Sequence, residues 1–345
     1  MGVAAKRSSA RPRVKPLIAR YRRLIARFPK VRIVVVGDLV ADEFIYGRID
    51  RVSREAPVLI LSYDSAEVVP GGAGNAASNA AALGARVDVV GVVGRDSAGV
   101  RLLDAMPPRA SVRRVARASE YMTPVKTRIL AGGVHSAKQQ VVRVDRPAGA
   151  ITRAISRQVE RNLTEVIRTA DVVIISDYGS GLVTPALWQR ALEASKRKRA
   201  PLVLVDSRYA LSGFVGMTAC TPNESEVDAL LGVRINDQPD VLEKSGRALL
   251  TTLKSRAVLV TRGSRGMALF EPGKATDHIR IVGSDEVADV TGAGDTVIAV
   301  FSLALAAGAT FGEAARLANY AGGIVVMKRG TATVSAEELL GALGA

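Results

Sequence analysis

The chain places a glycine-rich segment with one carboxylate, Gly292-Ala293-Gly294-Asp295, directly before a long helical pattern at 296–308. The spacing of apolar residues predicts that this segment forms the N-terminus of a helix. The first N–H groups of a helix lack partners inside it, and the helix dipole adds positive charge there, so such a start suits an anion. Asp295 is then a candidate base beside the anion, although Asp also commonly caps a helix.

A second glycine-rich helix start lies in "PGGAGNAASNAAALGA", residues 70–85, where Gly71 and Gly72 precede Asn75. This segment matches a dinucleotide fingerprint only weakly, and no acidic residue follows at the end of a second strand. An NAD-dependent oxidoreductase is therefore one alternative function. The sequence contains no GxxxxGK[ST], which excludes a P-loop.

Two further segments carry oxygen-rich side chains at short spacing. "TPNESE" at 221–226 puts Asn223 and Glu226 three residues apart, where both could reach hydrated Mg²⁺ or phosphate oxygens. "VVGDLVAD" at 35–42 puts Asp38 and Asp42 at the end of the first strand, a natural place to hold sugar hydroxyls. Turn glycines, strand-end caps and a surface Asn-Glu pair are the structural interpretations of the same residues.

Composition limits the class of protein that positions these groups. The 345 residues are 48% hydrophobic and 23% charged, as in ordinary globular proteins. Cys220 is the single cysteine, which excludes an internal disulfide and fits a reducing compartment, so we expect a cytoplasmic protein. No apolar run approaches the length of about 18 residues that spans a bilayer, and no signal peptide is evident. The two histidines, His135 and His278, are too isolated for a zinc cluster.

The net charge of +15 is concentrated at the N-terminus. Residues 1–32 hold eleven Lys or Arg and no acid, which leaves 37 basic and 33 acidic residues in the rest of the chain. Apolar residues recur at helical spacing in this arm, so we expect 1–30 to be a basic amphipathic extension docked on the body. The alternative is that the arm contacts nucleic acid or a membrane surface, as in a scaffold protein. Charge alone does not decide between docking on the body and such a contact. We do not expect nucleic-acid binding.

Beyond residue 30, short apolar runs alternate with helix-length segments. The predicted strands are 31–38, 87–94, 171–177, 201–206 and 257–263, and the predicted helices include 75–84, 151–169, 185–197 and 239–255. Continuous apolar runs favour parallel strands covered by helices on both faces. The sequence therefore predicts a doubly wound α/β fold whose ligands lie beyond the carboxyl ends of the strands.

This alternation is interrupted by two segments, about 43–64 and 122–145. Their pattern predicts β-hairpins. We expect them to form a small inserted lid on a single domain, 31–345. Positive charge concentrates in these segments, at Arg51, Lys126, Arg128, Lys138 and Arg143. If the hairpins cover the acceptor, this charge favours an anionic sugar phosphate over a free sugar, although surface lysines and arginines are also commonly just solvated.

Taken together, these motifs resemble the PfkB/ribokinase family of carbohydrate kinases over residues 31–340. Within that family, "YGRIDRVSREAPV", "ISDYGSG" and "DVTGAGDTV" look most like the D-glycero-β-D-manno-heptose 7-phosphate kinases. The resemblance implies a ribokinase-like doubly wound, mostly parallel sheet with a β lid. It also implies transfer of the γ-phosphoryl group of ATP to the anomeric O1 of that heptose phosphate. A ribokinase-like or nucleoside kinase acting on an unphosphorylated sugar is the alternative.

The resemblance also implies roles for individual residues. Asp295 matches the catalytic base, and the backbone of Gly292, Ala293 and Gly294 matches the anion hole. The positions that match nucleotide contacts are Asn223, Glu226, Thr261, Gly263, Asn319 and Gly323, with Glu226 near Mg²⁺, directly or through water. The candidate substrate-binding residues are Asp38, Asp42, Arg51, Gly71, Gly72, Asn75, Lys126, Arg128, Gln140, Arg143 and Asp177. Family members often use K⁺ beside the anion hole, and their lids often pair, which suggests a homodimer.

Three positions depart from the heptose kinase pattern. Ser180 stands where those kinases usually carry Lys, and Ser207-Arg208 stands where they usually carry Pro-Lys. These changes affect phosphate-handling positions, so they leave the kinase chemistry intact and put the acceptor sugar in question. Neither histidine lies in the H-x-G-H signature of the nucleotidyltransferase often fused to this subgroup, so we expect no nucleotidyl transfer from this polypeptide.

Overall fold

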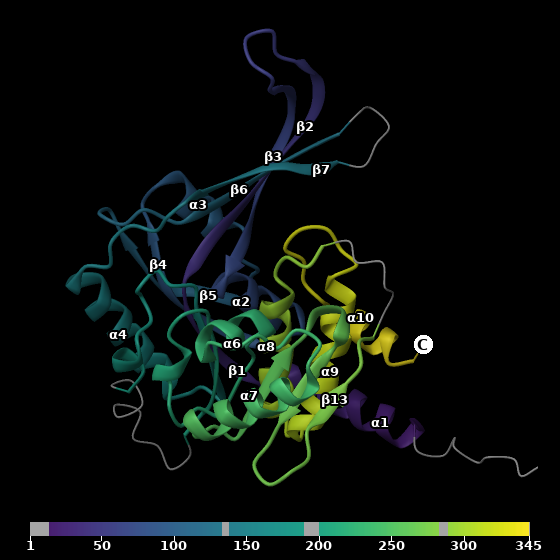
Figure 1. The fold of residues 1–345 in the computed structure, drawn as a ribbon. Coiled ribbons are helices and arrows are strands. Elements are labelled where there is room, and N and C mark those ends of the chain that lie inside the picture. The colour runs from purple at the N-terminus through teal and green to yellow at the C-terminus, as the bar shows by residue number, and fades with distance from the viewer. Residues whose placement is uncertain (1–13, 133–137, 190–199, 283–288, 345) are drawn as a thin grey trace, which may run out of the picture.

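The computed structural model describes residues 14–132, 138–189, 200–282 and 289–344. In these residues a nine-stranded sheet forms the body, and a separate four-stranded sheet projects from one end of it (Figure 1). The strands of the large sheet follow the order β13-β12-β11-β10-β9-β8-β1-β4-β5. All neighbours are parallel except β11–β12 and β12–β13, which are antiparallel.

The five predicted strands are confirmed as strands of this sheet, and four further strands extend it. The strand bounds are β1 Arg32–Gly37, β4 Arg86–Gly94, β5 Ala110–Ala118, β8 Val172–Asp177, β9 Leu202–Ser207, β10 Ala219–Cys220, β11 Ala257–Thr261, β12 Met267–Phe270 and β13 Asp277–Ile279.

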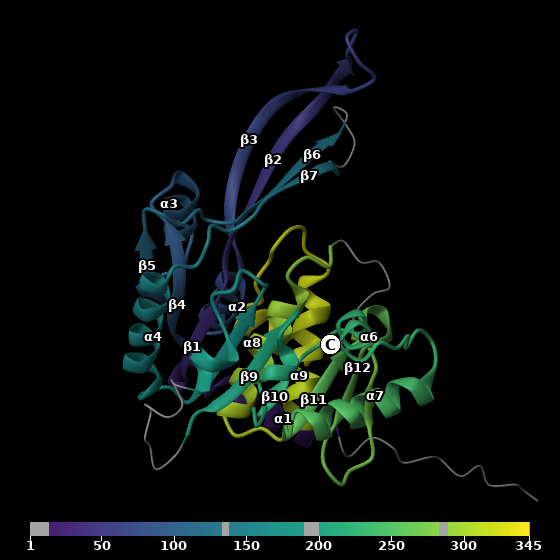
Figure 2. The same cartoon turned by 60° about the vertical axis from the view of Figure 1, so that its left-hand side comes forward.

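Side chains of the central strands alternate between two buried clusters. In β1, Ile33 and Val35 belong to one cluster, whereas Val34 and Val36 belong to the other. Both faces are therefore covered, which is why these strands read as continuous apolar runs. The first cluster draws side chains from α1 Val14–Ile25, α2 Ala73–Ala82, α3 Ser97–Asp104, α8 Ala293–Ala306, α9 Phe311–Val325 and α10 Ala336–Ala342. The second draws them from α4 Arg153–Ile167, α6 Glu224–Leu231 and α7 Pro239–Thr252 (Figure 2).

Three of the four predicted helices are found as α2, α4 and α7, with no end shifted by more than three residues. The fourth, 185–197, lies largely outside the described residues. The described part of the N-terminal arm forms α1, which packs on the body through Tyr21, Leu24 and Ile25. Arg20 fixes it further, because its guanidinium pairs with Glu313 at 3.0 Å. Residues 1–13 of the predicted basic arm lie outside the described residues.

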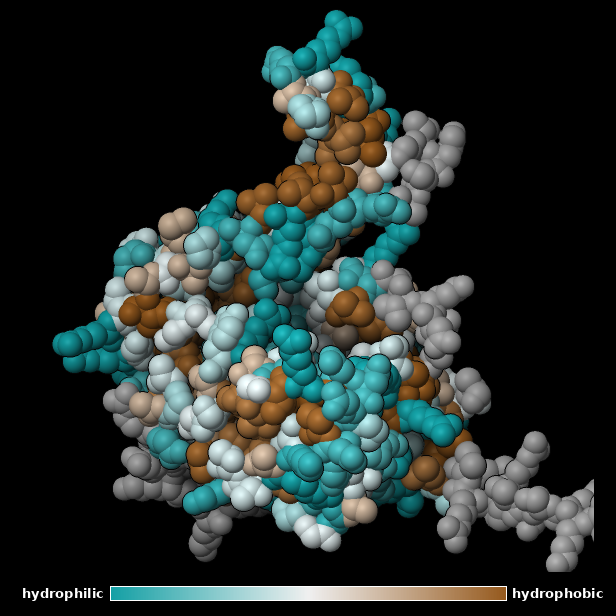
Figure 3. All heavy atoms as spheres, in the orientation of Figure 1, coloured by the Kyte–Doolittle hydropathy of each residue, from teal (hydrophilic) through white to brown (hydrophobic). Residues whose placement is uncertain are grey.

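The small sheet consists of β2 Leu39–Val52, β3 Leu59–Gly72, β6 Val125–Gly132 and β7 Gln139–Arg146, and we refer to these four strands as the lid. Its order is β3-β2-β6-β7; the two hairpins are antiparallel inside, and β2 pairs with β6 in parallel. β2 starts earlier and β3 ends later than the sequence pattern suggests. Apolar side chains of the lid remain exposed, among them Val52, Leu59 and Tyr63, and brown spheres gather on this part of the surface (Figure 3).

The helices in the described ranges include none that is both long and apolar enough to cross a membrane. The carboxyl ends of β1, β8 and β9 meet at one edge of the large sheet, and Asp177 and Asp206 at these ends line a cavity together with the start of α8.

Candidate active site

The start of α8 leaves backbone N–H groups available. Gly292 caps the helix with φ of 76°, a left-handed conformation that favours glycine, and a Cβ there would overlap the amide of Asn75. The N–H of Ala293 donates to the carbonyl of Val290 at 3.2 Å. The N–H of Gly294 has no hydrogen-bond partner among the described residues, so this amide can meet an anion.

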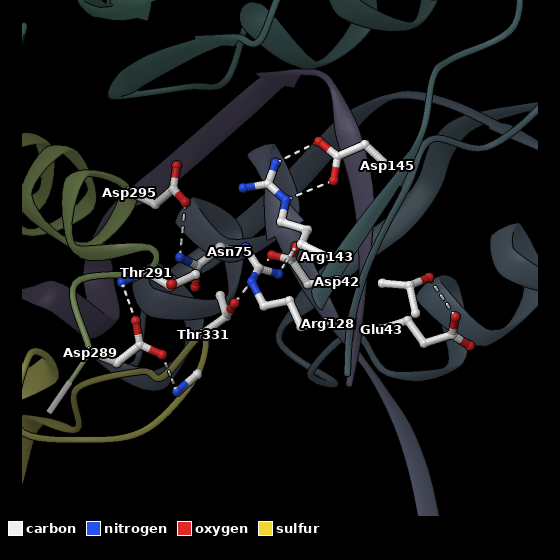
Figure 4. Close-up of polar contacts among 12 residues, drawn as sticks. Asp42, Glu43, Asn75, Arg128, Arg143, Asp145, Asp289, Thr291, Asp295 and Thr331 are labelled. Atoms are coloured by element: carbon white, nitrogen blue, oxygen red, sulfur yellow. Dashed lines mark hydrogen bonds and ion pairs between the residues drawn. The ribbon is translucent and has the colours of Figure 1, made fainter. Parts of the chain in front are cut away.

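The carboxylate of Asp295 is buried and held by two donors from other elements. Asn75 Nδ2, on α2, donates to Oδ2 at 2.9 Å, and the Tyr178 hydroxyl, in the loop after β8, donates to Oδ1 at 2.9 Å. Figure 4 shows the Asn75 amide pointing at this carboxylate. No side chain caps α8 at Gly292, so the capping interpretation of Asp295 is wrong.

The environment of Asp295 tunes its proton affinity. Burial raises the pKa of Asp295 from 3.8 to about 6, while the hydrogen bonds from Asn75 and Tyr178 and the charge of Arg208 oppose the rise and the charge of Asp42 adds to it. A carboxylate with this pKa is ionised at neutral pH and can accept a proton, as general base catalysis requires.

Asp42, on β2, lies in a second buried network close to this base (Figure 4). Arg128 Nη1 on β6 pairs with Asp42 Oδ1 at 2.7 Å, and the Thr331 hydroxyl donates to Oδ2 at 3.1 Å. Gly71 is required beside it, because a Cβ there would overlap Asp42 Oδ2. The ion pair therefore joins the two lid hairpins to each other, and the hydrogen bond from Thr331 joins them to the C-terminal segment that contains it.

Asp38 uses both carboxylate oxygens to order the loop after β8. Its Oδ2 accepts from the N–H groups of Tyr178 (2.8 Å) and Ser180 (3.1 Å), and its Oδ1 accepts from the Ser180 hydroxyl. Burial raises the pKa of Asp38, and these hydrogen bonds oppose the rise. Gly72, with φ of 58°, lies against the same strand end, since a Cβ there would approach the Asp38 carbonyl oxygen too closely. Ser180, one of the departures from the heptose kinase pattern, is thus an anchor for Asp38.

A cavity of about 190 Å³ opens in front of Asp295, and several further carboxylates line it. We call it the carboxylate cavity; its acidic residues are Asp177, Asp206, Glu226 and Asp295. Asp177 is committed to local structure, because it accepts from Gly179 N–H (2.9 Å) and from the Ser207 hydroxyl (2.6 Å). Burial and the nearby charges of Glu226 and Asp295 raise the pKa of Asp206 well above its ordinary range.

Asn223 and Glu226 hold the start of α6 by a reciprocal capping box. Asn223 Oδ1 accepts from the Glu226 N–H and Glu226 Oε2 accepts from the Asn223 N–H, both at 2.9 Å. Both residues also line the carboxylate cavity. The other Glu226 oxygen has no hydrogen-bond partner among the described residues. Burial raises the pKa of Glu226, so a cation in the cavity would relieve the cost of its charge.

The oxygen donors of the carboxylate cavity suit a hard cation such as Mg²⁺. In the described ranges no cluster of three or more His, Cys, Asp or Glu is arranged to hold a metal alone. That combination fits an ion that keeps waters and phosphate oxygens among its ligands, as Mg²⁺ does in phosphoryl-transfer sites.

A second cavity, of about 160 Å³, adjoins the first on the α8–α9 side; we call it the apolar cavity. Its lining includes four of the six candidate nucleotide-binding residues, Thr261, Gly263, Asn319 and Gly323. Thr261, Val290 and Gly294 line both cavities, so the two share a wall at the start of α8. Asn319 Nδ2 donates to the Arg280 carbonyl at 2.7 Å, which leaves its amide oxygen as the group that can face a ligand.

A third cavity, of about 370 Å³, lies between the body and the lid; we call it the cationic cavity. Lys126, Arg143, Arg146 and Arg208 line it together with Asp38 and Asp145. Arg143 is neutralised by Asp145 through two bonds of 2.7 and 2.6 Å. Lys126 and Arg208 have no carboxylate partner among the described residues, and burial lowers the pKa of Lys126. The cavity thus offers three cations without an ion-pair partner among the described residues, Lys126, Arg146 and Arg208.

The structure does not bring every predicted site residue to these cavities. Arg51 lies near the far end of β2, is exposed and pairs with its neighbour Asp50. Gln140 lines a separate opening of about 560 Å³, beside Tyr46 and Arg329. Neither residue lines the cavities around Asp295: Arg51 lies far along β2, whereas Gln140 lines an opening that Asp289, Arg329 and Gly330 of the body also line.

Sequence reasoning missed three residues that line or support the site: Tyr178, Asp206 and Thr331. Arg208, noted there as a departure from the heptose kinase pattern, also lines the carboxylate cavity. Asp206 follows an apolar strand, the same signal that singled out Asp38. Tyr178 follows the strand that ends at Asp177, so the rule that ligands bind at carboxyl ends of strands could have found both. No local signal marks Thr331.

Known proteins are similar to this chain over most of its length. A family model described as "pfkB family carbohydrate kinase" matches residues 32–339. The Bifunctional protein HldE of Geobacter metallireducens is 40% identical over 326 residues, which cover 93% of this chain and 64% of that protein. The chain therefore spans about 64% of the length of the relatives it matches.

Solved structures share the fold. Arabidopsis thaliana ribokinase complexed with ribose and ATP superposes with a TM-score of 0.69 and 20% identity, covering 91% of this chain and 98% of that chain. Phosphofructokinase-2 from Escherichia coli in complex with fructose-6-phosphate gives 0.73 and 20%, with the same coverage. At this identity the likeness concerns the fold alone, and it confirms the predicted ribokinase-like α/β class.

Proposed function

The chain belongs to the pfkB family of carbohydrate kinases, and we propose that it transfers the γ-phosphoryl group of ATP to the anomeric O1 of D-glycero-β-D-manno-heptose 7-phosphate. One observation carries the proposal. A buried carboxylate, Asp295, with a pKa near 6 lies one residue from an unpartnered amide at the start of α8. This pairing offers a proton acceptor and an anion contact at one point, as alcohol phosphorylation requires.

In the proposed reaction the acceptor hydroxyl gives its proton to Asp295. Its oxygen forms a bond to the γ-phosphorus while the bond from that phosphorus to the bridging oxygen breaks, and the electron pair leaves with ADP. The backbone of 292–294 stabilises the transferring group; Gly294 supplies a free amide, and Ala293 must exchange its bond to Val290 for one to phosphate. Positioning and charge stabilisation supply most of the rate in such transfers.

We assign the nucleotide to the apolar and carboxylate cavities, which share Thr261 and Gly294. The adenine would occupy the apolar cavity beside Asn319, and the phosphates would run past Asn223 and Glu226 toward Asp295. Glu226 and Asp206 would hold Mg²⁺, directly or through water. When bound, Mg²⁺ neutralises phosphate charge. A K⁺ ion beside the 292–294 backbone stays a prediction of the family resemblance.

We assign the acceptor to the region between Asp295 and the cationic cavity. Asp42 and Asn75 would meet sugar hydroxyls, and Lys126, Arg143 and Arg208 would meet the distal phosphate. The support for a phosphorylated acceptor is the set of cations in this cavity without an ion-pair partner among the described residues, because such groups bind phosphate strongly. A kinase for an unphosphorylated sugar is the alternative, kept because Ser180 and Arg208 depart from the heptose kinase pattern. The homodimer and the cytoplasmic location also stay predictions of the resemblance.

The test is a comparison of acceptors with Mg-ATP. The heptose 7-phosphate, the same heptose without phosphate, ribose and a nucleoside are supplied in turn, and ADP release is measured. We expect kcat/KM for the phosphorylated heptose to exceed that for the others by at least about a hundredfold. Phosphorus NMR of the product should show a phosphate on the anomeric carbon. Turnover of unphosphorylated sugars alone would overturn the proposed acceptor and favour the alternative.

A further inference from the structure

Tyr178 lies between the cationic cavity, proposed for the phosphate of the acceptor, and the carboxylate cavity in front of Asp295. Its side chain lines both the cationic cavity and the carboxylate cavity, and so does Arg208. An acceptor with its phosphate in the cationic cavity must therefore reach Asp295 past this ring. The proposed reaction gives Tyr178 no task, although it touches the proposed base directly.

The Tyr178 hydroxyl makes the bond to the base that an acceptor hydroxyl would have to make. It donates to Asp295 Oδ1 at 2.9 Å, while Oδ2 already accepts from Asn75. Burial and the charges of Asp295 and Asp206 raise the pKa of Tyr178 well above its ordinary value. The phenol thus keeps its proton at neutral pH and donates it to the hydrogen bond with ionised Asp295, so it covers the base and cannot replace it.

Two cations rest on the ring of Tyr178. Lys126 Nζ, from the lid, lies 5.0 Å from the ring centroid, and Arg208 Cζ, after β9, lies 4.6 Å from it. Neither cation has a carboxylate partner in the described residues, and the same holds for Arg146 in this cavity, whereas Arg143 has Asp145. A cation–π contact is weaker than a charge-assisted bond to phosphate, so a phosphate group in this cavity would take both cations from the ring.

We propose that Tyr178 is a specificity-determining residue that covers Asp295 until a phosphate-bearing acceptor draws Lys126 and Arg208 off its ring. The acceptor hydroxyl then takes the place of the phenol on Asp295 Oδ1. This inference rests on the proposed function for the position of the acceptor, and it adds a reason why phosphorylated sugars are selected. It also predicts protection of ATP, because water that enters in the absence of an acceptor finds the base occupied.

The first test needs no sugar. The full chain with Tyr178→Phe is incubated with Mg-ATP alone, and hydrolysis is measured as ADP release. In hydrolysis the oxygen of water bonds to the γ-phosphorus, ADP leaves and Asp295 takes the proton. We expect the variant to hydrolyse ATP about tenfold faster than the parent, the effect of one lost hydrogen bond to a charged group. Tyr209→Phe, which removes an exposed phenol hydroxyl nearby, is the matched control and should behave as the parent.

The second test supplies the phosphate separately from the sugar. With an unphosphorylated sugar as acceptor, inorganic phosphate should stimulate turnover by the parent severalfold and leave Tyr178→Phe unchanged. The phenylalanine variant should also discriminate about tenfold less between a sugar phosphate and the same sugar without phosphate. If the heptose is the wrong acceptor, the test can use any other sugar and its phosphate that the protein turns over. Its outcome therefore does not depend on whether the heptose assignment is correct. Unchanged or slower ATP hydrolysis in the variant, or equal stimulation of both proteins by phosphate, would overturn the inference.

Discussion

The body and the lid treat charged residues in opposite ways. In the body, Asp295 is almost completely buried and each of its oxygens accepts a bond from a side chain on another element. In the lid, charged pairs such as Arg51–Asp50 and Arg143–Asp145 lie near the surface between close neighbours in the sequence. Arg128 is the exception, since it lies where the lid meets the body and pairs with the buried Asp42.

This contrast separates two tasks. Burial amplifies electrostatic effects, so the body can shift the pKa of one carboxylate to about 6 and hold it in place for chemistry. Exposed pairs in water contribute little energy and can exchange one partner for another. The lid is therefore suited to selecting an anionic acceptor, while the body carries out the chemistry.

Removal of the proposed base from the body should cause the largest loss of activity. We expect Asp295→Asn to lower kcat by a factor of about 10² to 10⁴, because the amide cannot take the proton from the acceptor hydroxyl. Steady-state ADP release measures the loss, and circular dichroism checks the fold. Asp104→Asn, at an exposed position on α3, is the control and should keep full activity. Parent-like turnover by Asp295→Asn would refute the assigned chemistry.

Loosening the base should cost less and should shift its titration. The hydrogen bond from Asn75 lowers the pKa of Asp295, so Asn75→Ala should raise that pKa above the parent value of about 6. Because the ionised base is the active form, the acidic limb of kcat/KM should move to higher pH, and kcat should fall about tenfold or more. Rates recorded from about pH 5 to pH 9 test this shift. Asn162→Ala on α4 is the control and should not change the pH of the acidic limb of kcat/KM. An acidic limb at the parent pH in Asn75→Ala would argue against Asp295 as the base.

Removal of a lid cation should affect binding more than chemistry. We expect Lys126→Gln to raise KM for the sugar phosphate about tenfold, the loss of one charge-assisted contact, and to change kcat by much less. Lys138→Gln is the control, because Lys138 pairs with Asp64 outside the cationic cavity. Equal increases of KM for phosphorylated and unphosphorylated sugars would show that Lys126 does not contact the phosphate.

The far end of the lid should tolerate change. Arg51→Gln removes an exposed ion pair with Asp50, so the free energy of unfolding should change by less than about 0.5 kcal/mol and the kinetic constants should stay as in the parent. Urea unfolding and initial rates are the measurements. A specific rise of KM for the sugar phosphate would restore Arg51 to the acceptor site and weaken the division drawn here.

Local patterns were enough to predict most of the body. The strands around Val34 and Ile174 are apolar without interruption because both of their faces are buried, and that pattern is visible in the sequence. The glycine-rich start of α8 was equally visible, because the left-handed Gly292 and the small residues beside it are local requirements. Short strands such as β10 and β12 were missed because two to four residues show no clear period.

The polar contacts that complete the site could not be predicted in the same way. Asn75 and Tyr178 meet Asp295 from segments that lie far from it in the chain, and only the fold brings them together. The reach of the lid was also hidden, since the charge of Arg51 looks the same in sequence as that of Lys126. Fourteen residues of extended β2 carry Arg51 away from the site, whereas Lys126 lies near the start of β6.

The parallel ladder between β2 and β6 also sets an order of assembly. Ala41 pairs with Val125 and Arg48 with Gly132, so joining the two hairpins closes a loop that contains α2, β4, α3 and β5. Contacts between such distant segments form slowly, since the entropy of closing the intervening loop must be overcome before any pairing is gained. β1 and β4 pair across a shorter separation, Ile33 with Val87, so their ladder can form earlier, and slow-exchanging amides should appear in β1 and β4 before they appear in β6.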